Sequence, residues 1–445
     1  MGNTRALAAT IVVLTFVIFG RPSLALAQDA DLVIEWNRVL FSVAPPGVPV
    51  VRPAAMLHIA IFDAVNAIER AYTPYRFEVR ASRGASPEAA AAQAAHDVLT
   101  ALFPTQQATF DTILDSQLAN LPAGRKRQGI AIGRAVARAV LEWRQNDGWP
   151  ATIVPDPMYV LPATPGNWQP TPPGFSFAPF TFFPNVTPFG IQTSSQFLPP
   201  PPPTLTSERY ATDFNETKSL GSATSDVRTA EQTEMALRIA GVGFSTAPTE
   251  PFFKVAADVA RTQGLSLVET ARLFTFLSVA SHDGFQTSFT SKFVYGLWRA
   301  VTAIPRADED ENPLTDADPD WMPLLITPPY PTYVGNAACL AGAAARALQL
   351  VFGTDEVPFF VTWVGIAPNL DVTRAYDRFS VLSEEFARSR VYGGIHFQFD
   401  SDAAQSVCPK VADYVFANYM IERRCGNRAS KGGCLGTDRA QGLEP

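Results

Sequence analysis

Charge, cysteine and histidine are all scarce in this sequence of 445 residues. Only 17% of the residues are charged, and the chain contains four cysteines and four histidines. Because 47% of the residues are apolar, the composition excludes disordered, collagen-like and disulfide-scaffold proteins. The chain has no repeat of about 20 to 50 residues and no flexible linker, so one large hydrophobic core is expected.

Long apolar runs are also missing, with one exception at the N-terminus. Arg5 precedes an apolar run at 7–20, and residues 25–27 have the small-x-small pattern that signal peptidase requires. We therefore expect a signal peptide at 1–27 and a secreted or periplasmic protein. A membrane anchor is the alternative, but the run is shorter than the roughly 20 residues that cross a bilayer. No later stretch is long enough for a span.

Loss of that segment removes Arg5 and Arg21 and changes the formal net charge from −7 to −9. A strongly acidic chain repels polyanions, which argues against nucleic acid or an anionic membrane as a partner. The expected partners are small-molecule substrates, and an oligomer is left open.

The four cysteines form an even set, with three possible pairings. Cys425 and Cys434 flank a Gly-rich tail and are placed to close a small loop, which would leave Cys339 and Cys408 to each other. A cysteine metal site is disfavoured, because no Cys-x-x-Cys pattern and no nearby histidine is present.

Helical periodicity dominates most of the chain. Apolar residues recur at spacings of three and four from residue 31 to about 149, and helical text returns at Ser207. Ser266 and Glu269 form a capping box, which predicts a helix running from there toward Arg299. Further helices are expected at about 336–353, 373–389 and 401–423.

A segment rich in Pro and Phe interrupts this pattern. A solvated polyproline linker is one interpretation, but exposed Phe and Trp would be poorly soluble, so an extended strap lying on the helices is favoured. The expected divisions are a signal peptide (1–27), an N-terminal helical part (28–154), the strap (155–206), a C-terminal helical part with the functional site (207–424) and a loose tail (425–445).

Three of the four histidines have ordinary structural explanations. His58 and His96 lie on helical apolar faces, where a core histidine is expected. His282 is adjacent to Asp283, which favours a structural hydrogen bond.

His396 has unusual surroundings, in ARSRVYGGIHFQFD. A helix is expected to end near Arg390, and Gly393 and Gly394 permit a tight turn that brings His396 back toward that helix end. The guanidinium and the imidazole would then face one spot. An ordinary helix stop is the alternative interpretation.

Lys292 and Arg299 form a second candidate cluster, in SKFVYGLWRAVTAI. Seven positions are almost two helical turns, so both cations are expected on one helix face. The apolar residues between them must be buried, which draws the charged groups toward a partner anion, although surface cations are the alternative.

A third candidate lies where a proline-dense loop ends at Tyr333-Val334-Gly335-Asn336. A helix of small residues begins there, and its free N–H groups and positive dipole end favour an anion. The alternative is a plain loop-to-helix junction.

In this order the three segments resemble the signature of the vanadium-dependent haloperoxidases, a family that shares its fold and anion site with type 2 phosphatidic acid phosphatases. The family pattern is K-x6-R-P, then P-S-G-H, then S-R-x5-H. Lys292 and Arg299 match the first motif, and Ser389, Arg390 and His396 match the third. The flanks WRAVTAI, DPDWMPLLITPPYP and RVYGGIHF also read like bacterial members, and the resemblance covers most of residues 31–423.

The resemblance implies an all-α fold of two helical bundles with vanadate, or phosphate in its place, held between them. His396 would be the axial ligand of vanadate, or the nucleophile toward phosphate. Lys292, Arg299 and Arg390 would balance the charge of the equatorial oxygens, with the Gly335 N–H as a further donor.

The second motif departs from the family pattern. Val334 stands in place of a serine donor, Asn336 in place of the acid–base histidine, and Ala300 in place of the first motif's proline. An amide has no proton that titrates near neutral pH, and loss of a general acid costs about 10²–10⁴ in rate. Tyr333 and Asp283 are the candidate replacements.

Three functions are therefore weighed. The leading one is a haloperoxidase-like protein that binds vanadate or phosphate, with reduced or altered peroxide-dependent halide oxidation. A phosphoester hydrolase acting through His396 and a non-catalytic anion-binding pseudoenzyme are the alternatives. A purely structural helical protein would bind no anion.

Overall fold

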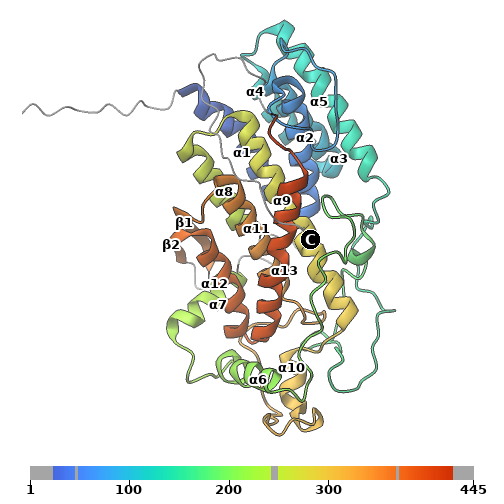
Figure 1. Ribbon diagram of the computed structural model, residues 1–445, viewed down its shortest axis with the longest axis vertical. Helices are drawn as coiled ribbons and strands as arrows, with labels where there is room; N and C mark the ends of the chain where they lie inside the picture. Colours follow the sequence, from blue (N-terminus) through green and yellow to red (C-terminus); the bar gives the residue numbers. More distant parts are fainter. Residues whose placement is uncertain (1–23, 46–48, 242–248, 367–369, 424–445) are drawn as a thin grey trace, which may run out of the picture.

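The computed structural model describes residues 24–45, 49–241, 249–366 and 370–423. In these residues the protein is mostly α-helical and forms an elongated body (Figure 1). The all-α fold class expected from the sequence is confirmed. The signal peptide at 1–27 stays a prediction, because residues 1–23 lie outside the described part, and so does the tail from residue 424.

The N-terminal helices form the upper part of Figure 1. They are α1 (Leu24–Val43), α2 (Val51–Glu69), α3 (Pro87–Leu102), the short 3₁₀ turn η1 (Pro104–Gln106), α4 (Gln107–Leu118) and α5 (Ala123–Arg144). α3 and α5 pack so closely that a Cβ on Gly129 would lie 2.3 Å from the Ser86 carbonyl oxygen. Among the described residues, α2 is the one helix long and apolar enough for a membrane span, and it is buried as a core helix.

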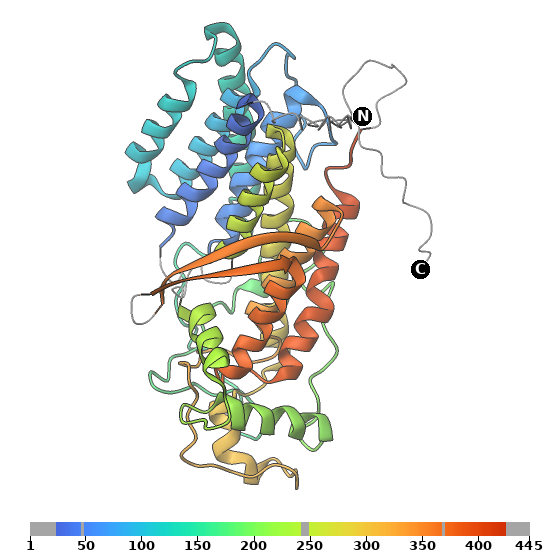
Figure 2. The same ribbon diagram turned by 90° about the vertical axis from the view of Figure 1, so that its left-hand side faces the viewer.

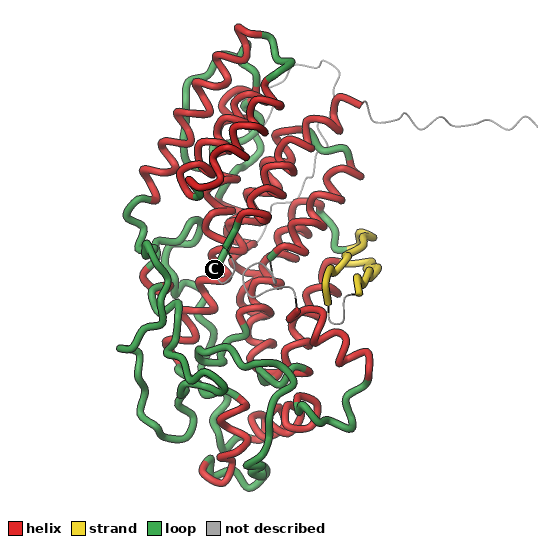
Figure 3. Tube along the Cα trace, turned by 180° about the vertical axis from the view of Figure 1, so that it is seen from behind, coloured by secondary structure: helices red, strands yellow, loops and turns green. Residues whose placement is uncertain are grey.

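The segment between α5 and α6 has no α-helix and contains one 3₁₀ turn, η2 (Phe183–Asn185). Figure 3 shows such loop segments along one side and the lower end of the molecule. Trp168 is buried and donates its backbone N–H to the Gly296 carbonyl, and Trp298 donates to the Gly166 carbonyl. The segment therefore packs on the helices and fixes the chain that follows α9.

The remaining elements follow in the C-terminal half. They are α6 (Glu208–Gly221), α7 (Ala230–Gly241), α8 (Glu250–Gln263), α9 (Leu267–Tyr295), α10 (Ala300–Ala303), η3 (Ile304–Glu309), α11 (Asn336–Phe352), β1 (Glu356–Ile366), β2 (Leu370–Arg378), α12 (Phe379–Tyr392) and α13 (Gln398–Asn418). α9 is the central helix and packs against α2, α11 and α13.

α9 begins as expected and ends earlier than expected. The capping box of Ser266 and Glu269 is present at its start. The helix stops at Tyr295 because Gly296 takes the left-handed conformation, with a φ of 59°, and donates its N–H to the Lys292 carbonyl. The prediction of a helix running to Arg299 was wrong in this last turn.

Two antiparallel strands form a hairpin that crosses the helices in Figure 2. Residues 373–378 belong to β2, so the prediction of a helix from 373 was wrong there; the helix α12 begins at Phe379. In β1, Val357, Phe359, Val361 and Trp363 are buried, whereas Phe360 is 67% exposed. This alternation with a period of two is a strand signal, and it lies between the helices that were expected at about 336–353 and 373–389.

A disulfide joins Cys339 of α11 to Cys408 of α13, with their Cα atoms 5.2 Å apart. This is the pairing that remained if Cys425 and Cys434 pair with each other. Those two cysteines lie outside the described residues.

Candidate anion site

The candidate site lies where the C-terminal end of α9, the start of α11 and the loop between α12 and α13 meet. Lys292 is in the last turn of α9, Asn336 is the first residue of α11, and His396 lies just before α13. Arg299 contacts His396 directly. The mid-chain cations and the C-terminal imidazole, separated by about 100 residues, are therefore brought together by the fold.

The hydrogen bonds of His396 define which ring nitrogen is protonated. Its Nδ1 lies 2.9 Å from Asp400 Oδ2 and 3.1 Å from Thr332 Oγ1, and its Nε2 lies 3.1 Å from Arg299 Nη1. A guanidinium N–H only donates, so Nε2 is the acceptor and the proton sits on Nδ1, where Asp400 accepts it. Burial, followed by the charge of Arg299 and of the other cations, lowers the pKa of His396 well below its usual value. The neutral ring thus presents a lone pair to the cations.

Asp400 is a site residue that the sequence reasoning missed. It is fully buried, and its Oδ2 also accepts from Thr332 Oγ1 and from the Phe397 N–H. Burial raises the pKa of Asp400 to about 6, against the opposing effects of Thr332 and the cations. Its position four residues after His396, in the first turn of α13, is the signal that indicates it.

Arg299 reaches the site from an extended segment and not from a helix face. Its Nε donates to the Tyr330 carbonyl at 2.7 Å and its Nη1 to the Ile395 carbonyl at 2.6 Å. Its Nη2 is buried without a hydrogen-bond partner among the described residues. Burial lowers the pKa of Arg299 to about 10. The expectation that Lys292 and Arg299 share one helix face was wrong, because Gly296 ends the helix between them.

Lys292 is fully buried, and all three of its N–H groups are engaged. Its Nζ donates to the carbonyls of Pro331, Thr332 and Val334 at 3.1, 2.7 and 2.6 Å. Burial and the nearby charge of Arg299 lower the pKa of Lys292 well below its usual value. Lys292 thus anchors the loop before α11 and contributes charge, but no free donor, to the site.

Arg390 is buried, with 8% of its surface exposed, and its guanidinium has no hydrogen bond or ion pair among the described residues. Burial lowers the pKa of Arg390 to about 10. The turn that follows it is formed as expected: Gly394 has a φ of 71° and lies so close to Gly221 that a Cβ would be 2.4 Å from the Gly221 oxygen. This close approach aims His396 back toward Arg390.

The start of α11 differs from the expectation. The Gly335 N–H donates to the Asp400 carbonyl at 3.1 Å, so it is not free for a ligand. Val334 is buried and has no hydroxyl to offer. Asn336 is half-buried, and its side chain acts on the nearby Tyr330 phenol, whose pKa it lowers against the larger effect of burial. Tyr330 was also missed, because nothing in the local sequence distinguishes it from a loop tyrosine.

The donor set fits an oxyanion. Three buried cations surround the site, and Asp400 is the buried carboxylate that faces them. Burying unpaired charge is costly, and Arg299 Nη2 and Arg390 Nε are donors without acceptors. An anion with several oxygens satisfies these donors and offsets the excess charge.

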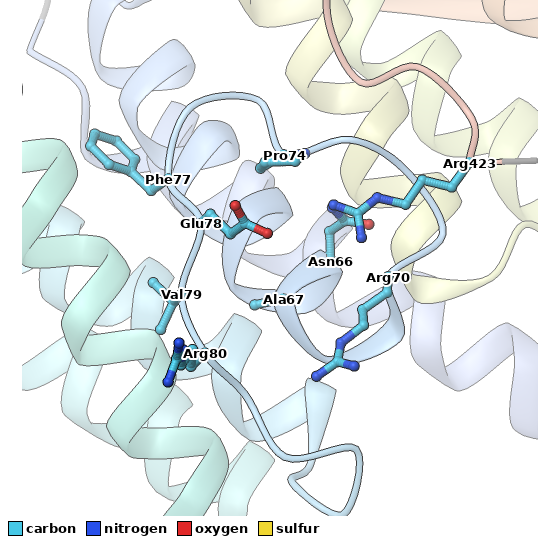
Figure 4. Close-up of a pocket in the computed structure, with 9 residues that line it drawn as sticks. All are labelled: Asn66, Ala67, Arg70, Pro74, Phe77, Glu78, Val79, Arg80 and Arg423. Atoms are coloured by element: carbon cyan, nitrogen blue, oxygen red, sulfur yellow. The ribbon is translucent and has the colours of Figure 1, made fainter.

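A separate cavity of about 480 Å³ lies at the opposite end of α9, where Arg272 donates to the Met420 carbonyl (Figure 4). Its lining residues are Asn66, Ala67, Arg70, Pro74, Phe77, Glu78, Val79, Arg80 and Arg423. Unlike the site at His396, this lining contains no buried polar side-chain atom that lacks a partner. The unsatisfied donors that indicate an anion are therefore at the other end of the helix.

The other histidines have structural contacts. His58 is fully buried, with Nε2 3.1 Å from Asn37 Oδ1, as expected of a core histidine. His282 is buried with Nδ1 2.9 Å from Asp283 Oδ1, which confirms the expected hydrogen bond. His96 is half-buried and contacts Asp97 and Asp111, so it is a surface ion-pair residue and not a core histidine.

The fold and the site together define a helical-bundle protein with a buried cluster of cations around His396. In comparison with known proteins, residues 272–423 match the family model of the VCPO second helical-bundle domain. The vanadium chloroperoxidase of Curvularia inaequalis is 23% identical over 483 aligned positions, which cover 84% of this chain and 78% of that protein.

Solved structures agree with this comparison. A bacterial vanadium-dependent iodoperoxidase superposes with a TM-score of 0.71 at 23% identity, covering 90% of this chain and 97% of that one. A holo-type bacterial vanadium-dependent chloroperoxidase superposes with a TM-score of 0.66 at 15% identity, covering 89% and 93%. The chain has the vanadium haloperoxidase fold, and its resemblance to that family is confirmed.

Proposed function

We propose that this chain is an exported, vanadium-dependent haloperoxidase-like enzyme that binds vanadate, or phosphate in its place, between Arg299, Arg390 and His396. The observation that carries the proposal is the buried Arg390 guanidinium, which has no hydrogen-bond or ion-pair partner in the described part of the chain and whose charge acts on His396. The names of the similar proteins, a chloroperoxidase and an iodoperoxidase, support halide oxidation as the reaction.

The residues fit vanadate in three respects. Arg390 and the free Nη2 of Arg299 supply N–H donors for its oxygens, and Lys292 adds a buried positive charge. His396 Nε2 would be the protein ligand to the vanadium, because Asp400 holds the proton on Nδ1. Gly335 is left out of the donor set, since its N–H is already bonded to the protein. Bound vanadate supplies a Lewis-acidic centre that activates peroxide toward attack by halide.

Catalysis is expected to be weaker than in relatives that have a histidine at the position of Asn336. An amide holds an oxygen by a hydrogen bond but transfers no proton, and the loss of a general acid costs about 10²–10⁴ in rate. Val334 also removes one hydroxyl donor, which weakens anion binding by roughly 1–3 kcal/mol.

Hydrolysis of phosphoesters is a second candidate function, favoured by the protonation of His396. A neutral ring whose unprotonated Nε2 lies beside guanidinium groups is suited to attack a phosphoryl group once the anion displaces Arg299 from that nitrogen. Purified protein should then cleave aryl phosphates faster than alkyl phosphates, because aryl leaving groups need less help from an acid.

The direct test is a titration of the purified protein with orthovanadate, followed calorimetrically. Arg390→Ala should weaken binding about 10- to 100-fold, since it removes the unpaired guanidinium. Arg388→Ala is the matched control: Arg388 lies two residues before Arg390 in the same helix but is bonded to Glu216 and Gln398. Wild-type protein that binds neither vanadate nor phosphate would overturn the proposal.

Bromination of a phenolic dye with peroxide, bromide and vanadate tests the catalytic part. The wild type should show weak activity that His396→Ala abolishes, and Asn336→His should raise it by at least about tenfold. Vanadate binding without bromination in either the wild type or Asn336→His would instead identify a non-catalytic anion-binding protein.

A further inference from the structure

The two proton donors that the sequence suggested for this site are both committed elsewhere. The Tyr333 hydroxyl donates to the Pro200 carbonyl at 2.7 Å. The Asp283 carboxylate accepts backbone N–H groups from residues 189–191 and contacts His282. Neither side chain faces His396, so the replacement for the missing acid has to be sought among other residues.

Tyr330 is held firmly against the site. Its ring centroid lies 5.1 Å from Arg299 Cζ and 5.4 Å from Lys292 Nζ. Its carbonyl accepts from Arg299 Nε at 2.7 Å, and its ring packs edge-on against Phe289 at 5.1 Å. Prolines precede and follow it, which restricts the backbone. The Tyr330 ring is therefore held beside the site by the loop and by the cations together.

Tyr330 interacts with the residue that replaces the acid–base histidine. The Asn336 side chain is among the groups that lower the pKa of the Tyr330 phenol, against the larger effect of burial. When the Asn336 amide donates to the phenol oxygen, the hydroxyl proton remains free to be donated onward. Burial lowers the pKa of Arg390, and Tyr330 is the group that opposes this shift; the Arg390 guanidinium has no hydrogen bond among the described residues.

The electrostatic setting suits a donor that must recover its proton. Burial raises the pKa of Tyr330, so the phenol is protonated at neutral pH, whereas Arg299, Arg390 and Asn336 act in the opposite direction. A phenolate formed during a reaction would be stabilised by two guanidiniums and one amide.

We propose that Tyr330, supported by Asn336, is the hydrogen-bond donor and proton donor to the oxyanion held at His396. This inference rests on the proposed anion-binding function and names the residue that takes over the lost acid. In phosphoester cleavage, His396 Nε2 forms a bond to phosphorus as the ester P–O bond breaks, and the leaving oxygen takes the Tyr330 proton. The phenolate then removes a proton from water, whose oxygen displaces the His396 nitrogen and releases phosphate.

Binding of inorganic phosphate tests the donor role, with Tyr330→Phe compared with Tyr333→Phe. Both tyrosines lie in one loop, but the Tyr333 hydroxyl is bonded to the Pro200 carbonyl, whereas the Tyr330 ring lies against Arg299 and Lys292. Tyr330→Phe should bind phosphate about 10- to 100-fold more weakly, and Tyr333→Phe should stay within about twofold of the wild type. Equal affinity of Tyr330→Phe and wild type overturns the inference, whereas a wild type that binds no phosphate overturns the proposed function itself.

The proton transfer is tested by two substrates that differ in leaving group. Tyr330→Phe should reduce hydrolysis of an alkyl phosphate by about 10²–10⁴ and that of p-nitrophenyl phosphate far less, because nitrophenolate leaves without protonation. An equal loss on both substrates indicates a structural role and overturns the proton transfer. Absence of hydrolysis of either ester by the wild type overturns it as well.

Discussion

The Nη1 atom of Arg299 lies 3.1 Å from Nε2 of His396, although the two residues are 97 positions apart in the chain. This contact occupies the Nε2 lone pair that would bond the central atom of an oxyanion, so an entering anion has to displace the Arg299 guanidinium from Nε2. On the other side of the ring, Asp400 accepts the Nδ1 proton at 2.9 Å. The imidazole is thus held between a cation and a carboxylate, which fixes both its orientation and its tautomer.

Asp400→Asn should weaken phosphate or vanadate binding by about 10- to 100-fold, as is usual for residues that orient a ligand histidine. The amide no longer attracts the Nδ1 proton as a carboxylate does, so Nε2 becomes a poorer ligand. Asp402→Asn is the control: Asp402 lies in the same helical turn but bonds Arg209 and Gln398 at the surface. Calorimetry should find wild-type affinity in the control, and unchanged affinity in Asp400→Asn would contradict the orienting role.

Gly296→Ala should destabilise the protein and impair the site. Gly296 has a φ of 59°, and an added Cβ would lie 2.6 Å from Leu161 Cδ1. Gly353→Ala is the matched control, since Gly353 has a φ of 72° but nothing within 4 Å of the added Cβ. The left-handed backbone alone costs about 1–2 kcal/mol, which is the loss expected for Gly353→Ala in urea unfolding.

The loss for Gly296→Ala should be larger, and phosphate affinity should fall with it, because Gly296 lies three residues before Arg299 and accepts from the Trp168 N–H. Equal stability losses in the two variants, with unchanged phosphate affinity, would show that the packing around Gly296 does not position Arg299.

Cys408→Ala should lower the free energy of unfolding by about 2–5 kcal/mol, because the disulfide closes a loop with a sequence separation of 69 residues in the unfolded chain. Reductant should lower the melting temperature of the wild type to about that of Cys408→Ala, and it should leave the melting temperature of the variant unchanged. A melting temperature of the wild type that does not respond to reductant would argue against this bond.

His58 and His96 should give pH dependences of opposite sign. Burial lowers the pKa of His58 to about 3, so the folded protein leaves it neutral while the unfolded chain protonates it below about pH 6.5. The free energy of unfolding should therefore fall as the pH drops from about 6.5 toward 3, by about 2 kcal/mol at pH 5 for this residue. His58→Gln should remove that part of the slope in urea unfolding.

The pKa of His96 is raised by its hydrogen bond to Asp97, with a further contribution from Asp111. Its stabilising contribution is fully present below the unfolded pKa of about 6.5 and is lost as the pH rises through the higher folded pKa. His96→Gln should therefore destabilise the protein at about pH 5 and have little effect at about pH 9. If His58 and His96 contributed pH dependences of the same sign to the free energy of unfolding, the environments described for these two histidines would be wrong.

Local chemistry in the sequence was sufficient for the helical class, the capping box at Ser266 and the turn at Gly393 and Gly394. Each depends on the residues within a few positions, such as a serine that accepts from the third N–H or a glycine that allows a positive φ. Lys292, Arg390 and His396 could also be proposed as candidate site residues from the sequence, because motif spacing is a property of the chain itself.

Only the tertiary structure decided how those residues are used. Arg299 leaves the helix at Gly296, the three N–H groups of Lys292 are consumed by loop carbonyls, and the N–H of Gly335 is taken by Asp400. Asp400 and Tyr330 join the site from segments about 70 residues apart. Which donors remain free depends on which acceptors the folded chain brings within about 3 Å, and that distance is set by packing between remote segments.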